Sequence, residues 1–275
     1  MTDQTQSQPT RKKRPKRRAT VVSVAGEILL TCGALLLLFA YYESYWTNIE
    51  AHHAQEEAAT QMEDRWEHVN PRQAKDLQLG EAFARMYIPA FGSDFHFVIV
   101  EGTGDDDLLK GPGRYTDTQL PGEPGNFAVA GHRVGKGAPF NDLGNLHTCD
   151  AVVVETRNSW DVYRMLPVDS TDPQQRRTEA AKCLNPEQVE RVAQGDYAAV
   201  QGRRITLPGD VSTIEPIPGV KSGVLDTMEP LMTMTTCHPQ FSNKERMIIH
   251  AMMVRSDPKD PAQPDYRPPE LEENK

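Results

Sequence analysis

LMTMTTCHPQFSNKERMIIHAMM, residues Leu231 to Met253, predicts two strands joined by a short loop. Leu231–Thr236 is apolar and rich in threonine, with no glycine or proline, which favours a strand. The link that follows carries a proline and turn formers, so the first strand should end there. Met247–Val254 is a second apolar run with β-branched residues. If the two strands pair as neighbours, Cys237 and Arg246 lie near the same end of the sheet.

A thiol beside a guanidinium predicts a reactive site, because a nearby cation favours the thiolate. A cysteine nucleophile also needs a partner for proton transfer. His132 is the best placed histidine, since it follows the apolar run Asn126–Ala130 where a strand passes into a loop. His238 adjoins Cys237 but should point to the opposite face of an extended chain. His250 lies well inside the next strand, which predicts a buried, hydrogen-bonded role.

These residues resemble the sortase family. Thr233–Cys237, TMTTC, resembles the sortase signature T-L-x-T-C, with Met234 in the leucine position. Arg246 matches the arginine that sortases carry on the following strand, and Ala130–His132 matches the family's A-G-H context. The stretch TTCHPQFSNKERMIIHA is most similar to the corresponding sequence of class E sortases of actinobacteria. The resemblance covers roughly residues 77–256, apart from an insertion.

The strand pattern predicts an all-β fold. Short strands separated by turns, which favour a closed or nearly closed sheet, are expected at Phe83–Ile88, Phe95–Val100, Ala151–Thr156 and Val162–Met165. The resemblance implies the eight-stranded sortase β-barrel with short helices.

The resemblance also implies a role for each site residue. Cys237 is expected to attack a peptide carbonyl, and His132 to act as general acid and then general base. Arg246 should hold the substrate backbone and stabilise the developing oxyanion. Thr236 is expected to add a hydrogen bond on the substrate side. No cofactor is implied.

The implied function is a cell-wall sorting transpeptidase. Such an enzyme cleaves an LPXTG-like C-terminal sorting signal, LAXTG for class E, between Thr and Gly through a thioacyl intermediate. It then joins the protein to an amine of the peptidoglycan precursor lipid II. The chain carries neither an Asp-Pro-aromatic lid nor an apolar C-terminal span, which favours a housekeeping anchor over a pilus polymerase. A membrane-anchored cysteine peptidase and a non-catalytic wall- or pilus-binding module with a sortase-like barrel stay open.

The N-terminal region predicts a membrane anchor. Residues 21–42 form a mostly apolar run long enough to span a bilayer, and aromatic residues cluster at its far end. Residues 1–20 form a tail with a basic block, which predicts a cytoplasmic N-terminus and an extracellular catalytic domain. A cleavable signal peptide is the alternative, but the run is long for one and no small-x-small site follows closely. The net charge of −9 makes nucleic acid an unsuitable partner.

The rest of the chain divides by composition. Residues 43–76 are polar and helix-prone, which predicts a stalk that lifts the domain off the membrane. The catalytic domain should cover 77–256, as a monomer. Its segment 167–204 departs from the family pattern as a polar insertion with a helix at Pro186–Val192, and either shapes specificity or is a neutral elaboration. Residues 257–275 are acidic and rich in proline, which predicts a disordered tail.

The cysteines separate by position. Cys32 lies within the apolar run and is expected to be a small packing residue. Cys149 and Cys183 lie outside the cytoplasm, where disulfides persist, so a disulfide that ties the insertion to the barrel is a hypothesis. Cys237 is then the odd exported thiol, which is typical of a reactive or intermolecular cysteine.

No metal site is expected. His52 and His53 are adjacent and point to different faces of a helix. Asp105, Asp106 and Asp107 are consecutive, whereas a calcium loop spaces its ligands alternately.

Overall fold

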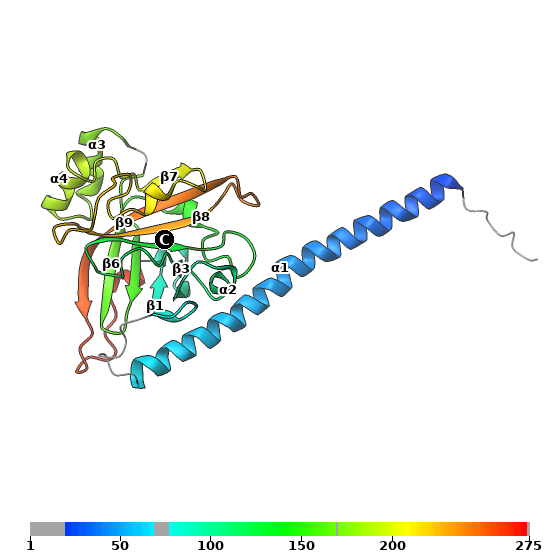
Figure 1. Ribbon diagram of the computed structural model, residues 1–275, viewed down its shortest axis with the longest axis horizontal. Helices are drawn as coiled ribbons and strands as arrows, with labels where there is room; N and C mark the ends of the chain where they lie inside the picture. The colour runs from blue at the N-terminus through cyan, green and yellow to red at the C-terminus, as the bar shows by residue number, and fades with distance from the viewer. Residues whose placement is uncertain (1–19, 69–76, 169, 274–275) are drawn as a thin grey trace, which may run out of the picture. The chain divides into compact units, whose positions relative to one another are not determined.

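The computed structural model describes residues 20–68, 77–168 and 170–273. The chain forms two compact units, Met1–Glu43 and Ser44–Lys275. Helix α1 (Val21–His68) begins in the first unit and ends in the second. The second unit contains the sheet and every other element (Figure 1).

A closed β-barrel forms the centre of the second unit. The described residues form a nine-stranded sheet in the order β6-β5-β1-β2-β3-β4-β8-β9-β7, and β6 also pairs with β9. That extra pairing closes a ring of eight strands, all but β7, and so confirms the expected all-β barrel. The strands are β1 (Ala82–Tyr87), β2 (His96–Glu101), β3 (Gly113–Arg114), β4 (Gly125–Ala130), β5 (Ala151–Glu155), β6 (Ser159–Met165), β7 (Arg203–Thr206), β8 (Pro230–His238) and β9 (Glu245–Pro258).

The length of β9 allows the barrel to close. Its first half pairs with β8 on one edge and with β7 on the other, where Arg203 lies opposite Ile249. Beyond that point β6 takes over the second edge, beginning with Met165 opposite Ala251. A strand of 14 residues can serve these three partners because each uses only part of its length.

Alternating side chains fill the barrel. In β8, Met232 and Met234 are fully buried in the interior, together with Phe127 and Val129 of β4. Successive strand residues point to opposite faces, so the residues between them face outwards. Short helices lie in the connections between strands: η2 (Pro89–Phe91), α2 (Asp105–Leu108), η3 (Leu143–Asn145) and η4 (Val211–Ile214). A further one, η5 (Pro269–Glu272), follows the last strand.

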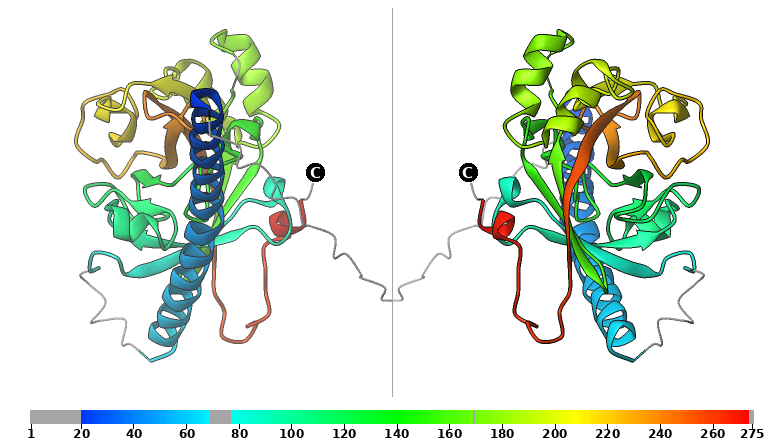
Figure 2. Two further views of the ribbon diagram at one scale, coloured as in Figure 1. Left: turned by 90° about the vertical axis from the view of Figure 1, so that its right-hand side faces the viewer. Right: turned by 90° about the vertical axis from the view of Figure 1, so that its left-hand side faces the viewer.

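The insertion folds as two helices with a core of their own. The helix expected at Pro186–Val192 is present as α4 (Pro186–Gln194), and α3 (Pro173–Ala180) precedes it. Each begins with proline after a capping side chain, Asp172 or Asn185. Figures 1 and 2 show the helices side by side at one end of the barrel.

Arg176 holds this insertion together. It is 1% exposed, and its guanidinium donates to the backbone oxygens of Val192 and Val200 at 3.0 and 2.8 Å. Burial lowers its pKa, and the charge of Glu179 acts in the opposite direction. Backbone carbonyls of the described residues accept its hydrogen bonds. Around it, apolar side chains pack against Leu231 of β8 and Met252 of β9.

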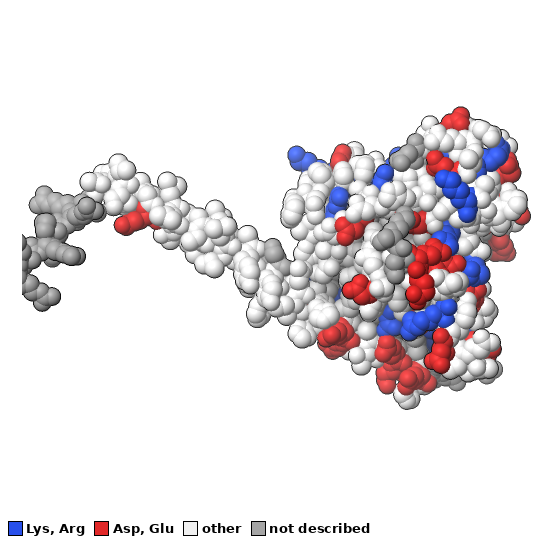
Figure 3. Space-filling view, turned by 180° about the vertical axis from the view of Figure 1, so that it is seen from behind, with Lys and Arg blue, Asp and Glu red and all other residues white. Residues whose placement is uncertain are grey.

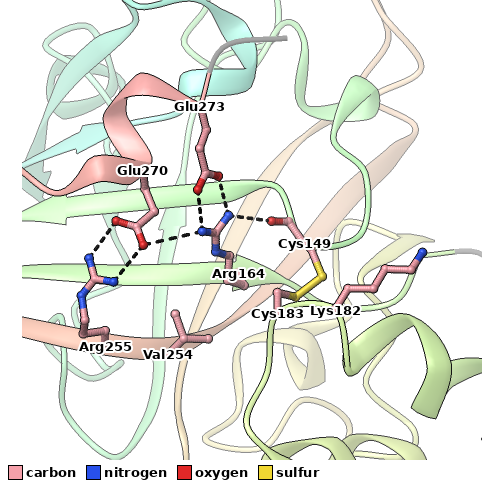
Figure 4. A pocket seen from close by; sticks show the side chains of 8 residues that line it. All are labelled: Cys149, Arg164, Lys182, Cys183, Val254, Arg255, Glu270 and Glu273. Atoms are coloured by element: carbon pink, nitrogen blue, oxygen red, sulfur yellow. Dashed lines mark hydrogen bonds and ion pairs between the residues drawn. A yellow bond between two sulfur atoms is a disulfide. The ribbon is translucent and has the colours of Figure 1, made fainter.

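The hypothesised disulfide is present. Cys149, just before β5, is bonded to Cys183 between α3 and α4, with 5.7 Å between the Cα atoms (Figure 4). The bond ties the insertion to the barrel, as the hypothesis held. The two remaining cysteines of the described residues, Cys32 and Cys237, are free thiols.

The expectation of a disordered tail after residue 256 is wrong for the described residues. Strand β9 continues to Pro258, and η5 places Glu270 against Arg255 at 2.7 Å. Glu273 forms a bidentate ion pair with Arg164 (Figure 4). The prediction from composition was wrong because the acidic residues that suggested disorder form ion pairs with arginines of the barrel wall.

The first half of α1 is apolar and exposed. Within the described residues it is the one helix long and apolar enough to cross a membrane. Figure 3 shows that hardly any charged side chains lie on this half, whereas they cover the barrel surface. The basic block used to orient the anchor lies outside the described residues.

The second half of α1 is helical, as expected for the stalk, and within the described residues 45–68 it packs on the barrel. Ala58 and Met62 are buried against Ala82, Val98 and Val100. Met62 is fully buried, and burial of such a side chain contributes about 2 kcal/mol. The polar composition of this segment concealed a narrow apolar stripe. Residues 69–76 of the expected stalk lie outside the described residues.

His250 is buried in the barrel wall, as expected from its place inside β9. It is 2% exposed, and its Nδ1 lies 2.7 Å from the backbone oxygen of Gln201, so Nδ1 carries the proton. Burial lowers its pKa to about 4.

Replacing both Cys149 and Cys183 with serine should destabilise the second unit. The bond closes a loop with a sequence separation of 34, for which chain entropy predicts a loss of about 4 kcal/mol in the free energy of unfolding. Urea unfolding in detergent measures this loss, with Cys32→Ser as the matched control. Alkylation of both cysteines in unreduced protein would contradict the bond.

Acid should weaken the fold through His250. Its folded pKa of about 4 lies below the usual 6.5, so the unfolded chain binds the extra proton first as the pH falls. The contribution of His250 to the free energy of unfolding is therefore fully present above pH 6.5. It is lost as the pH falls towards 4, by about 3 kcal/mol. Unfolding measured against pH should show a smaller loss in His250→Gln. An unchanged acid slope would assign the effect to other groups.

Candidate active site

Strands β8 and β9 bring Cys237 and Arg246 together. The two residues are direct partners in the antiparallel register, at the end of the hairpin. This confirms the expectation that they share one end of the sheet. The register follows from the alternation of both strands, since a slip by one residue would turn each apolar set out of the barrel.

Strand β4 brings His132 to the same level. It runs parallel to β8 with Ala130 opposite Thr235, and the backbone N–H of Gly131 donates to the Thr235 oxygen at 3.0 Å. Continued at the same register, the pairing places His132 level with Cys237. The three predicted site residues therefore come from three adjacent strands.

The site lies on the outer wall of the barrel. Met232 and Met234 face the interior, so the alternate residues of β8, which include Cys237, face outwards. Arg246 precedes Met247, which faces the interior, and so shares the outward face. An outward position at a strand end leaves the thiol half-buried and within reach of a substrate.

Thr236 braces the backbone rather than facing outwards. It is 2% exposed, and its hydroxyl donates to the oxygen of Gly131 at 2.8 Å. The hydrogen bond joins the residue before the nucleophile to the residue before His132. This contact differs from the expected hydrogen bond to substrate.

Asn243, in the β8–β9 loop, completes the surroundings of the thiol. The Cys237 Sγ lies 3.4 Å from its Oδ1. The Arg246 guanidinium donates to the backbone oxygens of Glu245 at 3.0 Å and Asn243 at 3.5 Å. Sequence reasoning treated this loop as a turn and missed Asn243, although its place between the two site residues was a usable signal.

Arg133 is a second residue that sequence reasoning missed. Its Nη1 donates to the backbone oxygen of Cys237 at 3.3 Å and to Nδ1 of His238 at 2.8 Å. His238 is therefore hydrogen-bonded to Arg133. It follows Cys237 directly in β8, so it was expected on the opposite face of the strand. Nδ1 of His238 accepts, so the neutral ring carries its proton on Nε2, which lies 4.0 Å from Glu245.

His132 has a free ring nitrogen and a perturbed pKa. Its Nε2 is buried and has no hydrogen-bond partner among the described residues. Burial lowers its pKa below the usual value, and the charge of Lys136 lowers it further, whereas Asp105 of α2 acts in the opposite direction. A buried nitrogen without a protein partner has hydrogen-bonding capacity that the described structure does not use.

This arrangement supports acyl transfer by a cysteine. It combines a nucleophilic atom, a titratable imidazole and a fixed guanidinium. The described residues contain no group of three or more His, Cys, Asp or Glu side chains that could hold a metal ion. A hollow of about 520 Å³ beside the disulfide includes none of the predicted site residues (Figure 4).

The two helices of the insertion lie away from this chemistry, whereas its last residues, Arg203 and Arg204, begin β7 beside β9. The core of the insertion packs on Leu231 and Met252, whereas Cys237 and Arg246 are at the other end of the same strands. The separation along β8 is about 20 Å at the usual rise of a strand. The position of the helices favours the second of the two readings left open above, a neutral elaboration, as far as contact with the substrate is concerned.

The sequence is similar to those of known sortases. Residues 86–254 match the family model for the sortase domain. Sortase SrtE1 of Streptomyces coelicolor is 30% identical over 262 residues, which cover 93% of this chain and 63% of that protein. Sortase SrtE2 of the same organism is 28% identical over 260 residues, which cover 90% and 87%. The chain therefore spans less than two thirds of SrtE1.

Solved structures show the same fold. The SrtF sortase from Corynebacterium diphtheriae is 65% identical, with a TM-score of 0.71 over 74% of this chain and 98% of that one. The SrtA sortase from Actinomyces oris is 26% identical, with a TM-score of 0.52 over 71% and 90%. The match covers more than half of the sequence and includes the barrel with its Cys237 strand, so the chain belongs to the sortase family of cysteine transpeptidases.

Proposed function

We propose that this chain is a membrane-anchored sortase. It cleaves an LPXTG-like sorting signal, LAXTG in the first instance, between Thr and Gly. It then joins the new C-terminus to an amine of the peptidoglycan precursor lipid II. The observation that carries the proposal is the register that sets Cys237 opposite Arg246, with β4 delivering His132 to the same level.

The reaction proceeds in two transfers. The Cys237 thiolate attacks the carbonyl carbon of the signal's threonine, the C–N bond breaks, and His132 gives a proton to the departing glycine amine. An acceptor amine then attacks the thioester, His132 takes its proton, and the thiolate leaves. The free, buried Nε2 suits these opposite tasks because no protein group competes for it in the described structure.

Arg246 stabilises the charge that develops on the carbonyl oxygen. Its side chain is oriented by backbone oxygens, and among the described residues it forms no ion pair with a carboxylate. A preorganised cation stabilises an oxyanion without reorganising during the reaction. Thr236 supports the site indirectly, by fixing the end of β4 against β8.

The apolar half of α1 anchors the enzyme, with the N-terminus in the cytoplasm and the barrel outside. Its length and composition suit a single crossing. An extracellular barrel also accounts for a disulfide, which oxidising compartments preserve.

The full chain in detergent should form a thioacyl adduct on Cys237 when incubated with a peptide that contains L-A-x-T-G. Mass spectrometry of the intact protein detects the adduct. Cys237→Ala removes the nucleophile and should abolish it, while Cys32→Ser should not. Adduct formation that persists in Cys237→Ala would overturn the assignment, and an adduct only with another signal would change the specificity alone.

The acceptor is tested by adding an amine that mimics the lipid II peptide. Joining of peptide to amine supports the transpeptidase. Release of the free acid at the same rate with and without amine would instead identify a peptidase. A barrel that folds and reacts with no sorting peptide would point to a binding module.

The acid limb of the pH profile should move in opposite directions for two charge variants. Lys136 lowers the pKa of His132, so Lys136→Asn should raise it; asparagine also tolerates the left-handed backbone of that position. Asp105 raises the pKa, so Asp105→Asn should lower it. The two shifts should be opposite in sign and should shrink as salt is added, because both charges are partly screened. The profile of kcat/KM measures them, and equal profiles would exclude His132 from the titration.

A further inference from the structure

The loop that follows His132 rests on helix α1. The backbone N–H of Gly137 donates to the side-chain oxygen of Asn48 at 3.0 Å. A Cβ placed on Gly137 would lie 3.5 Å from the Cβ of Ala51, and one on Gly135 would lie 3.6 Å from the Thr47 hydroxyl. The helix and the loop are therefore in direct contact, within the second unit.

The backbone of this loop is strained. Four consecutive residues, 135–138, have φ values of 64°, 50°, 76° and 39°. Two of them are Lys136 and Ala138, for which the left-handed region is costly. Such a run persists only where its surroundings hold it in place.

A residue of β2 also lies near the middle of the loop: a Cβ placed on Gly137 would be 3.7 Å from a ring carbon of Phe97. Beside Lys136 and Gly137 lies a hollow of about 530 Å³, lined by α1 residues such as His52 and by a cluster of aromatic rings, Phe91, Phe95 and Phe97. The ends of the loop are fixed to the barrel, where the Phe140 N–H donates to the His132 oxygen at 3.0 Å. Since a hollow provides no packing, the middle of the loop is held by its contacts with Phe97 and with α1, and Asn48 of α1 accepts the Gly137 N–H.

We propose that α1 positions the active site, with Asn48 as the positioning residue for the His132 loop. The proposal rests on the role of His132 in the proposed function. Displacement of the loop would move Lys136, one of the charges that acts on His132, and would change the position of the imidazole itself. Small misplacements of a catalytic group reduce the rate strongly.

The proposal gives a role to the part of α1 that follows the apolar run. The helix that contacts the loop is a direct continuation of the apolar run, and Asn48 comes just after the aromatic residues Tyr45 and Trp46. The segment between anchor and barrel is therefore part of the catalytic machinery's support, and its composition cannot be exchanged for that of an inert stalk.

The test uses full chain in detergent and three variants. Asn48→Ala removes the acceptor and should lower kcat for the sorting peptide about fivefold at unchanged KM, as expected for one lost hydrogen bond. Asn48→Asp retains an oxygen acceptor and should restore kcat to within about twofold. Gln61→Ala removes an exposed side chain of the same helix, bonded only within it, and should change nothing.

Hydrogen exchange across residues 132–140 provides a readout independent of activity. Exchange should be faster in Asn48→Ala and normal in Asn48→Asp. The proposal is overturned if Asn48→Ala has the same kcat and the same exchange rate as the wild-type protein. It is also overturned if Asn48→Ala and Asn48→Asp lose kcat equally. If wild-type protein processes no sorting peptide, the proposed function fails, while the exchange experiment still decides whether Asn48 holds the loop.

Discussion

The pairing of β8 with a different neighbour on each edge is the constraint on which the site depends. The parallel ladder to β4 and the antiparallel ladder to β9 each fix one register, and together they set three side chains at one level. Because strand side chains alternate with a period of two, a slip in either ladder would turn a site residue into the core. Filling the interior with Met232 and Met234 therefore also aims Cys237 at solvent. The same burial that stabilises the barrel specifies the geometry of its chemistry.

This strand is buried on its outer face as well, over most of its length. The insertion packs on the part around Leu231, and Asn126 links Thr233 to the loop before β8 through hydrogen bonds to both segments. The end that carries Cys237 and His238 is half-buried, as is Pro230 at the start of the strand. Covering the remainder of β8 holds it rigidly while restricting access to one end. The insertion thus supports the site from a distance, through the strand rather than through contact with the chemistry.

The sequence was most informative where pattern and chemistry coincide. Alternation and β-branched residues located the strands of the barrel, and the positions of Cys237, Arg246 and His132 matched a known family's motifs. It was least informative where the outcome depends on partners far along the chain. The acidic C-terminal segment became ordered because Arg164 and Arg255 face it, and no local property of either segment indicates this. Asn243 was missed for the same reason, since a turn residue becomes a thiol contact only after the hairpin has formed.

Helix α1 shows how a polar composition can conceal a structural surface. Most of its later residues are exposed, and a single stripe that includes Ala51, Ala58 and Met62 is buried on the barrel. A stripe this narrow cannot stabilise a helix strongly, but it can determine where the helix lies. Its first buried position, Ala51, is also next to Gly137 of the strained loop. Seating the helix therefore fixes the loop, and fixing the loop limits where His132 can be. Under the proposal made above, the part of α1 that follows the apolar run is therefore a support of the candidate active site.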